Sequence, residues 1–192
     1  RRTDDDRLVA RLLRARAHVA IRHGDLAAAR AWIEEALPLA RRAGDPVLEA
    51  HVCIEEGRLL WAEGRYDEAR STLDRWIRVT HERGPAFLEG YACNLRGMVS
   101  ESQGRLAESA AYFERALEIF RRVDNLRFEA IALMNLGVVC SGNGRFADSA
   151  SLYEKAREAF EAIADRAGIA DAIINLGAVQ VAAGRLEEAE ER

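Results

Sequence analysis

Apolar side chains recur along this chain three and four residues apart, the spacing that places them on one face of an α-helix. Short polar segments carrying glycine, aspartate or asparagine interrupt the pattern, and such residues end one helix and cap the next. The pattern predicts helices at about 5–22, 25–42, 46–62, 66–82, 86–102, 106–122, 126–142, 146–163 and 166–182, and another that starts at Leu186.

One turn motif returns every 40 residues without insertion or deletion. It reads Gly24-Asp25-Leu26, Gly64-Arg65-Tyr66, Gly104-Arg105-Leu106, Gly144-Arg145-Phe146 and Gly184-Arg185-Leu186. A second turn follows about 21 residues after each of these glycines, at Gly44-Asp45-Pro46, Gly84-Pro85, Asp124-Asn125 and Ala164-Asp165. Two turns in each period make every repeat a helical hairpin.

Other positions keep the same phase. Small residues stand seven before the glycine, at Ala17, Gly57, Gly97, Gly137 and Gly177, and five after it, at Ala29, Ala69, Ser109, Ser149 and Ala189. Small side chains let two helix backbones approach closely, so we expect helix crossings there. Apolar residues twelve before the glycine are predicted to face inward, at Leu12, Val52, Ala92, Ala132 and Ala172.

The composition agrees with an all-α fold, because the chain has 3 prolines in 192 residues and is rich in alanine, leucine, arginine and glutamate. Its formal net charge is -4, with both signs interleaved. That balance gives no general attraction to nucleic acid or to an anionic membrane, so neither partner is predicted.

Cys53, Cys93 and Cys140 lie within helical patterns, which favours buried thiols in a reducing compartment and a cytoplasmic location. No apolar stretch is expected to reach the roughly 20 residues that cross a bilayer. Because the first residue is not methionine and the last residues continue a helical pattern, we expect an excised piece of a larger protein.

The later repeats carry a family resemblance. Asn135-Leu136-Gly137 with Gly144-Arg145-Phe146 and Tyr153…Ala156, repeated as Asn175-Leu176-Gly177 with Gly184-Arg185-Leu186, resembles the tetratricopeptide repeat. The 40-residue period is similar to the long repeats in the sensor arms of MalT-like and other multidomain bacterial ATPase regulators. The resemblance implies a right-handed α-α superhelix of about four and a half hairpins, a single solenoid over residues 1–192, with repeats at about 10–49, 50–89, 90–129, 130–169 and a truncated 170–192.

The early repeats depart from the family, because Arg16, Glu56 and Arg96 occupy a position where it usually has leucine. A charge at a buried position needs a partner. Either Glu56 pairs with Arg16 or Arg96 across neighbouring first helices, or these side chains extend to solvent.

The resemblance also implies that the first helix of each hairpin lines a concave groove that binds an extended or helical segment of a partner. An asparagine amide there can bond both the N–H and the C=O of a peptide, although it could instead satisfy a neighbouring helix. An arginine could hold a partner carboxylate, although it could simply be solvated. The candidate partner-binding residues are Arg14, Arg58, Tyr91, Asn94, Asn135 and Asn175.

Sequence motifs of common reaction centres, HExxH, CxxC, GxSxG and GxxxxGK[ST], are absent from the chain. The four histidines share no position in the repeat that would bring them together, so no metal site and no cofactor are expected. The adjacent carboxylates Glu34-Glu35, Glu55-Glu56 and Glu187-Glu188 are interpreted as solvated surface. The chain is therefore predicted not to be an enzyme by itself.

The leading hypothesis is a protein- or peptide-binding scaffold, the sensor or adaptor arm of a larger bacterial regulator. The alternative is a solenoid arm that senses a small molecule for a signalling ATPase or transcription regulator. Self-association is a third possibility, because a truncated last hairpin would leave the apolar residues 176–181 without a covering helix.

Overall fold

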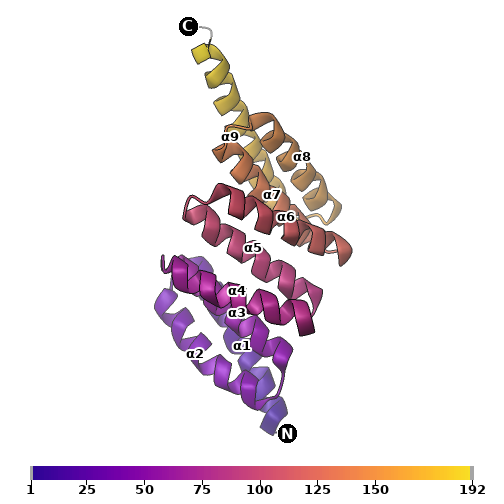
Figure 1. Ribbon diagram of the computed structural model, residues 1–192. Coiled ribbons are helices and arrows are strands. Elements are labelled where there is room, and N and C mark those ends of the chain that lie inside the picture. Colours follow the sequence, from indigo (N-terminus) through magenta and orange to yellow (C-terminus); the bar gives the residue numbers. More distant parts are fainter. Residues whose placement is uncertain (1, 191–192) are drawn as a thin grey trace. The chain divides into compact units, whose positions relative to one another are not determined.

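The computed structural model describes the backbone of residues 2–190 and the side chains of residues 3–184, and in that part of the chain every regular element is an α-helix (Figure 1). The helices are α1 (Arg2–His23), α2 (Leu26–Arg42), α3 (Pro46–Ala62), α4 (Tyr66–Arg83), α5 (Ala86–Ser102), α6 (Leu106–Arg122), α7 (Leu126–Gly142), α8 (Phe146–Ala162) and α9 (Arg166–Glu190). The predicted all-α fold is confirmed.

The chain divides into two compact units, residues 1–103 with α1 to α5 and residues 104–192 with α6 to α9. Within each unit a second helix of a hairpin packs against first helices on both sides: α2 contacts α1 and α3, α4 contacts α3 and α5, and α8 contacts α7 and α9. First helices also contact each other in the order α1, α3, α5. A single solenoid over residues 1–192 stays a prediction.

The turns after the first helices use glycine as predicted. Gly24, Gly64, Gly104 and Gly144 have φ between +72° and +79°, a left-handed conformation that a side chain disfavours. In the second turn, Gly44 is also left-handed, and Asp124 and Ala164 adopt φ of 52° and 53° without being glycine.

The last glycine turn was predicted wrongly. Helix α9 continues through residues 184–186, where a turn and a new helix from Leu186 were expected. The conformational free energy that a left-handed turn costs is offset when the following helix packs against the preceding one. The segment after Gly184 is too short to form a stable helix by itself. The side chain of Ala189 lies outside the described residues.

The small residues mark close helix crossings in α3 and α7, as predicted, but Gly177 of α9 is exposed and marks none. A Cβ atom on Gly57 would lie 2.7 Å from Cδ2 of Leu73, and one on Gly137 would overlap the ring of Tyr153. On α8, Ser149 is fully buried, and its hydroxyl donates a 2.7 Å hydrogen bond to the carbonyl oxygen of Gly137 on α7. These contacts hold α3 to α4 and α7 to α8.

The side chain twelve residues before the turn glycine is buried in the later repeats but exposed in the first repeat. Val52, Ala92, Ala132 and Ala172 are at most 1% exposed, whereas Leu12 is 57% exposed. The inward orientation predicted for Leu12 is therefore wrong, because no preceding second helix covers α1 in the described residues. The three cysteines are buried, as expected.

The predicted ladder through Glu56 is also wrong. The guanidinium of Arg16 stacks on the ring of Trp32, with its Cζ atom 4.2 Å from the ring centroid. Arg96 is 2% exposed, and its Nε–H donates a 2.9 Å hydrogen bond to Asp74 of the neighbouring second helix. Both arginines thus contact side chains of second helices.

One helical segment, Arg166–Gly184, is long and apolar enough to cross a membrane by length and composition, with a mean hydropathy of 1.4 and 17% of the window buried. This corrects the expectation that no stretch approaches that length. Gly168, Ala172 and Val179 are its buried residues, and the last two stand at the positions of Ala132 and Val139 in α7, which are buried as well. The repeat by itself therefore accounts for apolar residues at these positions of α9.

We predict that Ala164→Gly raises the free energy of unfolding by about 0.5–1 kcal/mol, because glycine removes the side-chain cost of the left-handed conformation. Urea unfolding followed by circular dichroism measures it. The matched change Gly144→Ala should lower stability by about 1 kcal/mol. Equal stability of Ala164→Gly and the parent chain would mean that this turn carries no strain.

We also predict that Gly137→Ala destabilises the fold by about 1–3 kcal/mol, because the new methyl group would overlap Tyr153. Gly177 stands at the same position of the next repeat, and a Cβ atom there would meet no other atom within 4 Å. Gly177→Ala should therefore stabilise by up to about 1 kcal/mol through helix propensity. The same sign for both changes in urea unfolding contradicts the assigned crossing.

Candidate functional site

The first helices α1, α3 and α5 place polar side chains from equivalent positions next to one another. Arg11, His51 and Tyr91 occupy one position of the repeat, and His18 and Arg58 occupy another. Because these helices contact in sequence order, the side chains form one surface, which we call the first-helix face. Its residues are Arg11, Arg14, His18, His51, Glu55, Arg58 and Tyr91.

The carboxylate of Glu55 lies at the centre of this face. Nδ1 of His18 is 3.2 Å from both carboxylate oxygens, and the hydroxyl of Tyr91 donates a 2.9 Å hydrogen bond to Oε1. Nε of Arg58 is 3.4 Å from Oε2, and a terminal nitrogen of Arg14 is 3.9 Å from Oε1. One buried acid thus connects residues of three first helices.

Glu55 is 1% exposed, so its interpretation as solvated surface was wrong. Burial alone raises the pKa of this carboxyl, but the hydrogen bond to His18, the charge of Arg58 and the hydrogen bond from Tyr91 outweigh burial and lower the pKa. The carboxylate therefore stays charged within the fold. A signal was present in the sequence, because Glu55 stands at the repeat position of Asn135 and Asn175.

Arg58 and Tyr91 contact each other as well as Glu55. Arg58 donates a hydrogen bond to the Tyr91 hydroxyl, and its Cζ atom lies 5.2 Å from the centroid of the Tyr91 ring. Burial, followed by the charge of Glu55, raises the pKa of Tyr91, so the phenol keeps its proton to donate. The Arg58 side chain is 17% exposed and that of Arg14 is 29% exposed. Arg14 is the more accessible of the two predicted arginines.

A pocket of about 470 Å³ opens beside Arg14, between α1 and the start of α3. Burial, followed by the positive charge of Arg14, lowers the pKa of His51 to about 4, so this imidazole is neutral at physiological pH. The pocket is lined by Arg11, Arg14, Asp45, Val47, Leu48 and His51.

The structure brings together three of the predicted partner-binding residues, Arg14, Arg58 and Tyr91. Asn94 lies one helical turn further along α5, is 4% exposed, and its Nδ2 is 3.9 Å from the sulfur of Met98. Asn135 and Asn175 belong to the second unit, on α7 and α9, and both are half-buried. The partner-binding role of these six residues stays a prediction. Among the described residues, no group of three or more histidine, cysteine, aspartate or glutamate side chains could hold a metal ion.

We predict that His51 makes stability depend on pH between 6.5 and 4. The unfolded chain binds this proton below about pH 6.5, whereas the folded chain binds it only near pH 4, so acidification through this window lowers stability. Because His51 is half-buried, the loss should be about 1–2 kcal/mol. Urea unfolding of His51→Gln should lack this loss, and the exposed-site control His23→Gln should retain it. Identical pH profiles for the parent and His51→Gln contradict the assignment.

Comparison with protein-family models matches the tetratricopeptide repeat over residues 91–162 and 128–192 with one model, over 54–124 with a second and over 10–35 with a third. A search of curated protein sequences finds no significant match to this chain.

Solved structures share the fold. BtubC (BKLC) from P. vanneervenii is 24% identical with a TM-score of 0.76, over 98% of this chain and 83% of BtubC. A signal-transduction ATPase with numerous domains and a tetratricopeptide-repeat sensor, from Pyrococcus horikoshii, is 17% identical with a TM-score of 0.73, over 100% of this chain and 29% of that protein. A Rap protein complexed with competence and sporulation factor is 12% identical with a TM-score of 0.81, over 96% of this chain and 52% of the Rap protein.

The chain thus spans 29% and 52% of two of these similar proteins, and at such identities the likeness concerns the fold. The residues that these models match include the four glycine turns at left-handed φ, at Gly24, Gly64, Gly104 and Gly144. This chain belongs to the tetratricopeptide repeat family.

Proposed function

We propose that this chain is a binding scaffold that receives an acidic peptide segment of a partner protein on the first-helix face, as the sensor or adaptor arm of a larger bacterial regulator. The observation that carries the proposal is the Glu55 cluster, in which side chains from α1, α3 and α5 converge on one buried carboxylate. A scaffold needs such an arrangement, because a partner segment that crosses several repeats requires groups held at fixed positions.

The charge of this face favours an acidic segment. Arg11, Arg14 and Arg58 outnumber the acids Asp45 and Glu55 in the pocket and its neighbouring cluster. Arg11 is exposed and Arg14 is partly exposed, so both can donate charge-assisted hydrogen bonds to a carboxylate.

The residues around Glu55 divide into two roles. Arg58 and Tyr91 hold the Glu55 carboxylate and act as positioning residues, since both are largely buried and bonded to each other. Arg14 is 3.9 Å from the same carboxylate, at the edge of the pocket, and is the group that contacts the partner. Because Glu55 is buried and held in place, it orders the Arg14 side chain before a partner arrives. Arg14 therefore loses less conformational entropy when the partner binds.

The similar proteins support a receptor role. One carries its tetratricopeptide repeats as the sensor of a multidomain signal-transduction ATPase, and a Rap protein of the same fold was solved in complex with competence and sporulation factor. Both observations agree with a repeat array that receives a smaller molecule, and both are compatible with the sensor or adaptor arm proposed here.

A displayed library of random peptides, selected on the whole chain, tests the proposal. We expect enrichment of aspartate and glutamate, and we expect Arg14→Ala to weaken the selected peptides at least about tenfold, as the loss of a charge-assisted hydrogen bond would. Glu55→Gln should weaken them as well, because Arg58 and Tyr91 lose their common partner. Titration calorimetry gives the dissociation constants.

The matched control is Arg41→Ala, which removes an exposed arginine of α2 that is paired with Glu49 away from this face. It should change the dissociation constants by less than about twofold. The double change Asn135→Ala with Asn175→Ala tests whether the binding surface extends into the second unit. Peptides that bind Arg14→Ala as tightly as the parent contradict the first-helix face, and heats of binding from acidic metabolites without peptide enrichment would favour the small-molecule sensor.

A further inference from the structure

The pocket beside Arg14 contains a polar side chain that has no partner within the described residues. This side chain is His51 of α3, whose imidazole makes no hydrogen bond or ion pair there. The two arginines of the pocket, Arg11 and Arg14, lie within 4.0 Å of carboxylate oxygens of Asp45 and Glu55. The ring nitrogens of His51 are therefore the groups that a bound molecule can engage without breaking a contact of the protein.

Two arginines of α1 oppose a positive charge on His51. Burial is the largest cause that lowers the pKa of this imidazole to about 4, the charge of Arg14 is the second, and the charge of Arg11 adds to both. At physiological pH the pocket thus contains a neutral imidazole beside two cations.

The acids near His51 do not supply the missing negative charge. Asp45, at the turn before α3, lies 3.2 Å from Nε of Arg7. Glu55, one helical turn further along α3, is engaged by the first-helix face, including the hydroxyl of Tyr91 on α5. Both acids favour a charged imidazole, but they do not outweigh burial and the arginines. A further negative charge has to come from a bound molecule.

A carboxylate held by Arg14 would change the balance of charges around the His51 imidazole. The carboxylate offsets the positive charge of Arg14 and can accept a hydrogen bond from the protonated ring. An opposite charge within about 4–6 Å favours the charged form, and we expect it to raise the pKa of His51 by roughly one to two pH units. Because the free and bound chains then differ in their affinity for a proton, the proton and the carboxylate strengthen each other's binding.

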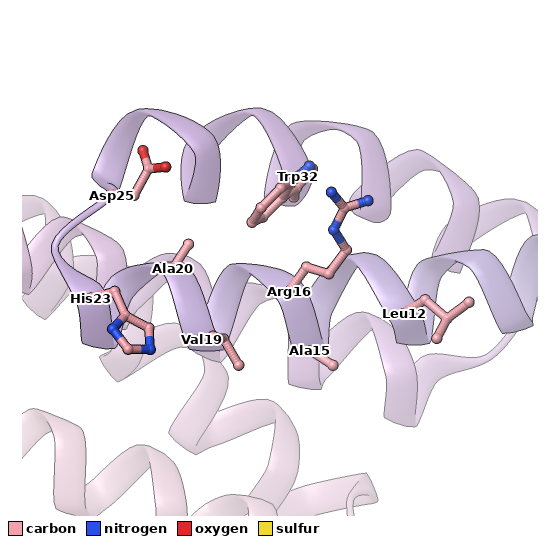
Figure 2. A pocket seen from close by; sticks show the side chains of 8 residues that line it. All are labelled: Leu12, Ala15, Arg16, Val19, Ala20, His23, Asp25 and Trp32. Carbon is pink, nitrogen blue, oxygen red and sulfur yellow. The ribbon is translucent and has the colours of Figure 1, made fainter.

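Another pocket on α1 lacks this arrangement (Figure 2). It measures about 500 Å³, lies between α1 and α2, and is lined by His23 and Asp25 among others. His23 is exposed to solvent, and Arg16 of the same pocket is stacked on the ring of Trp32. Water can hydrate the charged form of an exposed imidazole, so His23 provides the matched control for His51.

We propose that His51 is a specificity-determining residue of the first-helix face, which takes up a proton from the solvent when a carboxylate of the acidic partner segment binds beside Arg14, so that binding tightens as the pH falls. This role rests on the acidic-segment function proposed above and adds its regulation by pH. The free imidazole gains its proton only near pH 4, whereas the bound one gains it at a higher pH. The gain in affinity is therefore absent at pH 7, grows as the pH falls, and is complete near pH 4.

Titration calorimetry in buffers of different ionisation enthalpy counts the protons. The probe is the most enriched acidic peptide from the display selection, titrated into the whole chain at pH 5.5, where exposed carboxylates are still mostly charged. We expect uptake of roughly 0.2–0.8 proton per peptide, and a dissociation constant roughly two- to tenfold lower at pH 5 than at pH 7. His51→Gln should lose most of this uptake, whereas His23→Gln should keep it.

Nuclear magnetic resonance titration of the His51 ring protons keeps the result decisive if His51→Gln weakens binding itself. The midpoint should lie near pH 4 in the free chain and at least about one pH unit higher with the peptide bound. An unchanged midpoint, or equal proton uptake by the parent chain and His51→Gln, overturns the role of His51 while the acidic-segment function stands. Failure of the display selection to enrich acidic peptides contradicts that function and, with it, this role of His51.

Discussion

The packing of a second helix between two first helices is the contact on which the rest of this structure depends. In the first unit, α2 lies against α1 and α3, and the buried cluster that they share includes Ile33, Val52 and Leu59. A first helix buries its apolar residues on two sides, against the second helix of its own hairpin and against the second helix of the preceding hairpin. The side that faces other first helices is then left for polar residues, which is where the Glu55 cluster lies.

That constraint also explains where the chain exposes apolar surface. On α1, Leu12 and Val19 occupy positions that a preceding second helix covers in the later repeats. On α9, Ile173 is 53% exposed, although Leu133 at the same position of α7 is 3% exposed, because α8 covers Leu133 within the hairpin. Apolar residues of a first helix are thus exposed where a neighbouring second helix is missing from the described residues.

Repetition made most of the fold predictable, because each turn and each small residue appears several times with the same spacing. The turns at Gly24, Gly64, Gly104 and Gly144 and the crossing at Gly137 were predicted from that recurrence and are confirmed, whereas the turn at Gly184 is not formed. Predictions failed where a residue occurs once or lacks its neighbour. Glu55 was taken as solvated because it stands next to Glu56 in sequence, and Leu12 was taken as buried because its equivalents are.

The sequence by itself determined the repeat, its period, the boundaries of α2 to α8 and the family, since these depend on local spacing and on residues that favour turns or close packing. Tertiary structure decided which charges meet. His18, Glu55 and Tyr91 are separated by 36 and 37 residues in sequence and come into contact because first helices of successive repeats lie side by side. Side-chain pairing across repeats depends on burial and distance, and neither quantity follows from the period alone.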